Sequence, residues 1–233
     1  MILSAAISVV ATIGGAISSA ISTIGPAVSS FATKVAPVLG AIIDTIQPIA
    51  TFIVRFASTL LQSIGILKPD EKLDDLGERA LQAADSGITP SSCKNFDEYM
   101  DKLRNFDLDP EVAAKRSPTE KLVAGLAIGT IGTEDKFNAE RGSLNGMWLL
   151  PIASPSYFTP ERVESLISTG RLGGNILEYL EKRLSDGEAR SFEKKLELGE
   201  DGKTMPATNI DQLYEGLDSA RNEWPKIQKQ LDQ

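Results

Sequence analysis

The feature that most constrains this chain is its opening stretch, Leu3–Phe31, LSAAISVVATIGGAISSAISTIGPAVSSF, in which no side chain carries a charge. The shortage of charge continues through residues 1–67, where the charged side chains are Lys34, Asp44 and Arg55. That region has a net charge of +1, so the remainder must carry −9 for the chain to reach its total of −8. The change predicts an apolar Gly/Ala/Ser/Ile-rich helical region over residues 1–67 and an acidic soluble helical domain over residues 68–233.

The apolar residues of the opening region recur at alternating spacings of four and three, which is the pattern of a helix packed along one seam. The predicted seam or lipid-facing residues are Leu3, Ile7, Val10, Ile17, Ile21, Ile24, Val28, Phe31, Val35 and Ile42. Small residues follow another face, and they predict a close helix contact or a narrow lumen. This second set is Ser8, Gly15, Ser18 and Ser22. A soluble coiled coil would carry Glu and Lys beside its seam, so water is not expected on all sides of these helices.

Proline and glycine divide the region into about three predicted helical pieces, near residues 2–24, 27–39 and 41–66. The breaks are expected at Gly25-Pro26, Ala36-Pro37, Gly40 and Pro48. The first and third pieces are long enough to span a bilayer, which takes ~20 apolar residues. Three interpretations stay open: membrane insertion, burial by other subunits or by the C-terminal domain, and a signal or disordered segment. No Lys or Arg precedes the apolar stretch, which argues against export by a conventional signal peptide.

The acidic part is punctuated as a series of short helices. Ser117-Pro118-Thr119-Glu120 and Thr159-Pro160-Glu161 are typical helix starts, while Gly170 and Gly199 are typical stops. LVAGLAIGTIG, residues 122–132, is too short to cross a bilayer and predicts a buried core helix. Since no run alternates in the manner of a strand, we predict an all-α fold: a hydrophobic N-terminal helical arm followed by a small irregular helical domain.

Of the residue types on which many enzymes depend, His is absent and Cys occurs once. The chain has no His, which excludes Ser-His-Asp and Cys-His catalysis and His-containing zinc sites. Cys93 is the only cysteine, so no intrachain disulfide can form. We therefore predict a non-enzymatic protein without a catalytic residue, cofactor or metal site.

Two acidic clusters are candidates for a calcium site or for acid/base chemistry. DLDPE, residues 107–111, alternates carboxylates as a calcium loop does, but it lacks the glycine and distant Glu of that loop, so an acidic helix start is favoured. Glu134, Asp135 and Glu140 offer paired carboxylates for acid/base chemistry, and a solvated helix face is the favoured interpretation. An enzyme that uses buried carboxylates is the last alternative. The acidic charge, with no basic run to offset it, predicts no nucleic-acid partner.

The run IGGAISSAISTIGPAVSS resembles the membrane-active parts of tailed-phage tape-measure and ejection proteins, and the N-terminal regions of injection-system effectors. The resemblance covers residues 1–66 and lies in composition. It implies a protein of a virion or secreted particle, whose partners are copies of itself or other particle subunits and a lipid membrane. We therefore expect a self-associating component or cargo of a phage-like injection apparatus; the alternatives are a pore-forming toxin and a purely structural subunit with an apolar arm buried by neighbours.

Overall fold

The computed structural model describes residues 2–231, with side chains from Thr12 onward, and confirms the predicted all-α fold. Within these residues, β-pairing is limited to one isolated antiparallel bridge between Leu198 and Thr204. The helices are α1 (Ile2–Ser22), η1 (Pro26–Val28), α2 (Ser29–Lys34), α3 (Ala36–Thr45), α4 (Gln47–Ser63), α5 (Leu73–Asp85), η2 (Pro90–Ser92), α6 (Phe96–Arg104), α7 (Pro110–Ala113), α8 (Pro118–Lys136), α9 (Leu149–Ala153), α10 (Pro160–Ser168), α11 (Ile176–Leu180), α12 (Asp186–Leu196) and α13 (Ala207–Leu231).

The breaks in the apolar region mostly follow the prolines. Gly25 adopts φ 110°, a conformation that favours glycine, and Pro26 begins η1 directly after it. Pro37 and Pro48 are likewise the second residues of α3 and α4, where the missing amide has no helical partner to lose. The predicted break at Gly40 is wrong, because Gly40 lies inside α3, and the third predicted piece instead divides at Ile46, between α3 and α4.

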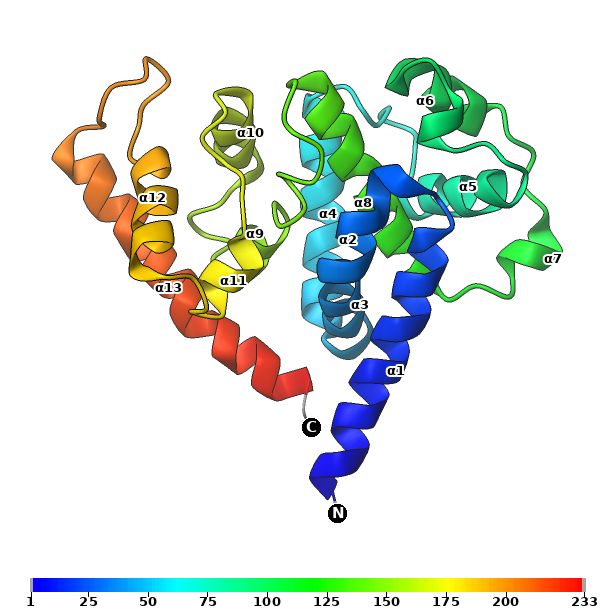
Figure 1. The fold of residues 1–233 in the computed structure, drawn as a ribbon, viewed down its shortest axis with the longest axis horizontal. Helices are drawn as coiled ribbons and strands as arrows, with labels where there is room; N and C mark the ends of the chain where they lie inside the picture. The colour runs from blue at the N-terminus through cyan, green and yellow to red at the C-terminus, as the bar shows by residue number, and fades with distance from the viewer. Residues whose placement is uncertain (1, 232–233) are drawn as a thin grey trace.

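Helix α8 lies in the middle of the molecule, with α5–α7 on one side and α9–α13 on the other (Figure 1). It begins at the predicted capping box, in which Ser117 accepts from the Glu120 amide and Glu120 accepts from the Ser117 amide. Its residues from Leu122 to Glu134 are all buried, which confirms the predicted core helix. Helices α1, α3, α4 and α5 all contact α8, so the apolar N-terminal region supplies much of its cover.

One core runs through the described part of the chain. A single cluster of buried apolar side chains extends from Ile17 to Ile227. The compositional boundary at Leu67/Lys68 lies in the loop between α4 and α5, and buried residues on both sides of it belong to this cluster. The apolar region and the acidic region therefore pack together in this structure.

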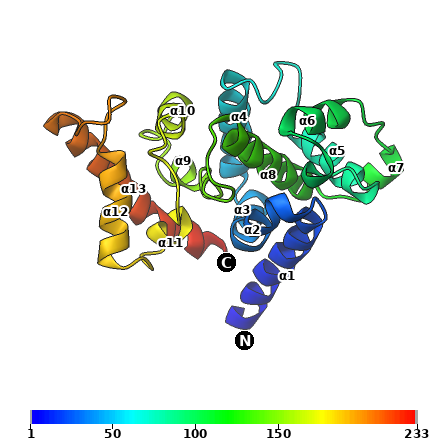
Figure 2. The ribbon, with the colours of Figure 1, turned by 45° about the horizontal axis from the view of Figure 1, so that its top comes forward.

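The N-terminal end of α1 extends beyond the rest of the fold in both views (Figure 2). We call residues 2–11 the projecting segment. Its sequence, ILSAAISVVA, contains no charged residue. The C-terminal end of α13 comes close to the same side of the molecule (Figure 1).

Candidate functional site

A groove of about 670 Å³ lies between α1, α3 and α13, and we call it the α1–α13 groove. Its volume falls within the ~300–1,000 Å³ that is usual for ligand sites. Its lining residues are Gly14, Gly15, Ser18, Pro37, Val38, Ala41, Ile42, Glu181, Trp224, Ile227, Gln228 and Leu231. Most are apolar or small, so the groove is suited to an apolar occupant.

Two glycines allow α1 and α3 to cross closely below this groove. A Cβ placed at Gly14 would lie 3.0 Å from Cβ of Pro37, and one at Gly40 would overlap the side chain of Ile17. Gly15 differs from both, because a Cβ there would meet no other atom within 4 Å. The space beside Gly15 is therefore open within this chain.

Glu181 is the one charged residue among those that line the groove. Its Oε2 accepts from Nε of Arg183 at 2.6 Å, and its Oε1 accepts from Nε2 of Gln228 at 3.1 Å. A carboxylate held in this way does not require a cation from an occupant. Trp224 lies beside the groove with its side chain fully buried, and its indole Nε1 has no hydrogen-bond partner.

The structure separates the predicted site residues into three groups. The first group is buried in the chain's own core and consists of Ile17, Ile21, Ile24, Val28, Phe31, Val35 and Ile42. The second group lies at the surface: Gly15 and Ser18 line the groove, while exposed Ser22 lies outside it and donates its hydroxyl to the Ser18 carbonyl at 2.7 Å. The third group lies outside the residues whose side chains are described: Leu3, Ile7, Ser8 and Val10.

Sequence reasoning missed the opposite wall of the groove. Trp224, Ile227 and Leu231 follow one another at helical spacing, so the sequence indicated an apolar stripe on this helix. The stripe did not indicate that α13 would pass α3 beside α1, because that contact joins opposite ends of the chain.

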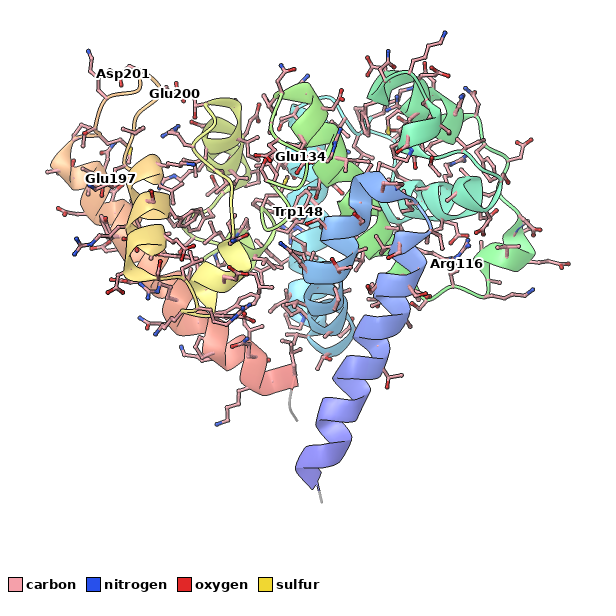
Figure 3. All side chains as sticks on the ribbon, in the orientation of Figure 1. Arg116, Glu134, Trp148, Glu197, Glu200 and Asp201 are labelled. Atoms are coloured by element: carbon pink, nitrogen blue, oxygen red, sulfur yellow. The ribbon has the colours of Figure 1, made fainter. Side chains whose placement is uncertain are left out.

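Glu134, which the sequence analysis placed on a solvated face, is buried at the end of α8 (Figure 3). Its Oε1 accepts from the amides of Gly142 at 2.8 Å and Leu144 at 3.0 Å. Burial raises the pKa of its carboxyl, an effect that these amides and Arg141 oppose. Glu134 therefore holds the loop after α8 in place. The prediction that Glu134 lies on a solvated helix face is wrong.

Three further acidic residues, Asp109, Glu197 and Glu200, have structural partners. Asp109 caps α7 by accepting from the amides of Glu111 and Val112, so DLDPE is a helix start. At the outer end of α12 (Figure 3), Glu200 accepts from the hydroxyl of Ser165 at 2.8 Å. Nearby, Glu197 accepts from the hydroxyl of Tyr214 and raises the pKa of that phenol to about 12. Each of these three carboxylates therefore has a structural role as a hydrogen-bond acceptor.

Comparison with protein-family models, with curated proteins and with solved structures found no match. Among the described residues, no single helix combines the length and apolar character needed to cross a bilayer. One bent pair, Pro26–Lys34 with Ala36–Thr45 at 55°, meets the criterion by length and composition alone.

Proposed function

We propose that the protein is a non-enzymatic, self-associating component or cargo of a phage or phage-like injection apparatus, and that it contacts a target membrane through its N-terminal helices. The observation that carries the proposal is the uncharged projecting segment, residues 2–11, at the end of a helix that extends beyond the body (Figure 1). A helix end of apolar sequence is stabilised by contact with lipid or with another apolar surface.

The rest of the apolar region is less available for this contact. Ile17, Ile21, Phe31 and Ile42 lie in the core, where each buried side chain contributes ~1.5–3 kcal/mol. Removing the whole stripe would therefore consume most of the ~5–15 kcal/mol by which domains are usually stable. We infer that the projecting segment makes the first membrane contact while residues 12–67 stay folded.

Flotation of the full chain with neutral phosphatidylcholine vesicles tests the membrane part of this proposal. We expect the parent protein to float and the Ile7→Asp/Val10→Asp variant to stay at the bottom of the gradient, because charge in the projecting segment opposes transfer into lipid. The matched control Ile7→Leu/Val10→Leu should float like the parent. Equal flotation of the parent and the Asp variant would rule out this segment as the membrane contact, provided that both melt at the same temperature.

The structural-subunit alternative is favoured by a separate observation, the α1–α13 groove, whose mostly apolar lining suits a protein segment as well as lipid. In that case the Asp variant would fail to enter assembled particles, while the parent would not float with vesicles. The pore-forming alternative requires the buried stripe to leave the core, so it predicts release of a vesicle-entrapped dye by the parent protein.

A further inference from the structure

We propose that the α1–α13 groove binds the projecting segment of a second copy of this chain, so that two α1 helices pair about a two-fold axis. Each copy then supplies one groove and one projecting segment. The inference deepens the self-association part of the proposed function and is independent of its membrane part.

A copy cannot fill its own groove with its own projecting segment. Helix α1 is continuous from Ile2 to Ser22, and the groove lies against its middle, at Gly14, Gly15 and Ser18. Residues 2–11 therefore continue along the helix axis away from these positions (Figures 1 and 2). If a projecting segment fills the groove, it must therefore belong to another molecule.

Charge favours a second copy as the occupant. With a net charge of −8, two copies repel each other over most of their surfaces. The groove and residues 2–11 are exceptions, because the segment is uncharged and the groove's single carboxylate, Glu181, is already engaged by Arg183 and Gln228. Docking one on the other therefore buries no unpaired charge.

The dimensions also match. Residues 2–11 form a helix ~15 Å long, and the groove wall from Trp224 to Leu231 is ~10 Å long at the same rise per residue. Gly14, Gly15 and Ser18 carry little or no side chain, so a second helix can approach the α1 backbone closely. An antiparallel pair places each projecting segment over the other copy's small residues, which is the self-complementary contact that a two-fold axis requires.

The expected contact area is small for a dimer. The accessible surface that lines one groove is limited, so the two symmetric contacts together bury less than the ~1,200 Å² at which the range for stable interfaces begins. The contact is therefore expected to be reversible and dependent on concentration.

Sedimentation equilibrium of the full-length protein tests the inference. We expect the parent to form dimers and the Gly15→Leu variant to dissociate at least tenfold more readily, because leucine fills the space that is open beside Gly15. The matched control is Ala16→Leu, which adds the same side chain at an exposed position of α1 outside the groove and should dimerise like the parent. As a monomer, neither variant should melt at a lower temperature than the parent, since neither position is filled within the chain.

A mixed cross-linking experiment identifies the occupant. Ser8→Cys and Val38→Cys are placed in separate chains, each also carrying Cys93→Ser, and the two proteins are mixed under oxidising conditions. We expect a disulfide between the two different chains, and expect its yield to fall at least tenfold when the Val38→Cys chain also carries Gly15→Leu. A monomeric parent at ~100 μM, unchanged dimerisation of Gly15→Leu, or a dimer without this cross-link would each overturn the inference. If the parent is monomeric and still floats with vesicles, the dimer is ruled out and the membrane proposal is retained.

Discussion

Helices α1 and α8 are built from nearly the same residues and have different surroundings. Residues 12–22 of α1, TIGGAISSAIS, and residues 122–132 of α8, LVAGLAIGTIG, are both uncharged and rich in small residues. In α8 every residue from Leu122 to Glu134 is buried, whereas in α1 burial is confined to a stripe that includes Ile17 and Ile21. Composition alone therefore does not distinguish a fully buried helix from a partly buried one.

The surroundings of the glycines in α8 and α1 show this difference in burial. Gly125, Gly129 and Gly132 of α8 each face a neighbour that would overlap with an added Cβ: Leu73, Leu61 and Phe96, respectively. In α1 only one side is closed in this way, because Gly14 faces Pro37 while Gly15 faces open space. A glycine with no neighbour lies beside open space, whereas a crowded glycine lies at a contact within the chain.

The comparison predicts the largest effect for a chain that begins at Lys68. Such a chain keeps α5 but lacks α1, α3 and α4, so the part of the central apolar helix α8 that these three helices cover would be exposed. We expect no cooperative thermal transition by circular dichroism. A sharp transition in this fragment would show that residues 68–231 form a core of their own.

The next largest effect is expected at a crowded glycine of α8. Gly125→Leu would drive its side chain into the Leu73 carbonyl and the α5 backbone, which cannot yield as a flexible side chain can. We expect a loss of more than ~3 kcal/mol in the free energy of unfolding, measured by urea titration, because overpacking usually costs ~1–3 kcal/mol even against movable neighbours. A loss below ~1 kcal/mol would mean that α5 and α8 are not as tightly packed as described.

Two carboxylates should respond to pH in opposite senses. Burial raises the pKa of Glu134 above the ordinary value of 4.5, so the folded state holds this proton more tightly than the unfolded state. For Glu71, burial opposes ionisation, but hydrogen bonds from Arg104 and the Lys68 amide outweigh it and lower the pKa. The contribution of Glu71 is thus present above pH 4.5 and is lost as pH falls through its folded pKa.

Urea titrations at several pH values distinguish the two groups. The stability of the parent relative to Glu134→Gln should increase as pH falls through the raised pKa of Glu134 towards 4.5, because protonation relieves the buried charge. The stability of the parent relative to Glu71→Gln should instead decrease as pH falls below about 4.5. A parallel response of both variants would contradict the assignment of opposite pKa shifts.

The smallest effect on stability is expected at the open glycine. Gly15→Leu replaces a poor helix former on an uncrowded face, so the monomer should gain up to ~1 kcal/mol in unfolding free energy. The measurement is urea unfolding at a concentration where the protein is monomeric, with Ala16→Leu as the control for added surface hydrophobicity. A marked loss of stability would show that the space beside Gly15 is needed within the monomer.

Sequence reasoning succeeded where the determining interactions are local. The capping box at Ser117, the cap at Thr159 and the buried run in α8 depend on residues within a few positions of one another, and the structure confirms all three. It failed at Gly40 and Glu134, because each is fixed by a neighbour from elsewhere: Ile17 packs on Gly40, and the amides of the following loop hold Glu134. The groove was beyond reach for the same reason, since α1 and α13 come from opposite ends of the chain.

Apolar residues from Ile17 to Leu67 belong to the core, and we propose that residues 2–11 make contact with lipid or with another copy. Hydrogen exchange of the full chain by mass spectrometry, with and without phosphatidylcholine vesicles, tests whether the core stays closed while this contact forms. We expect peptides from residues 17–67 to be protected as strongly as α8 under both conditions, and added protection to be confined to residues 2–18. Loss of protection across α2 and α3 when vesicles are added would contradict the claim, because it would show that the core opens to deliver its apolar stripe to the membrane.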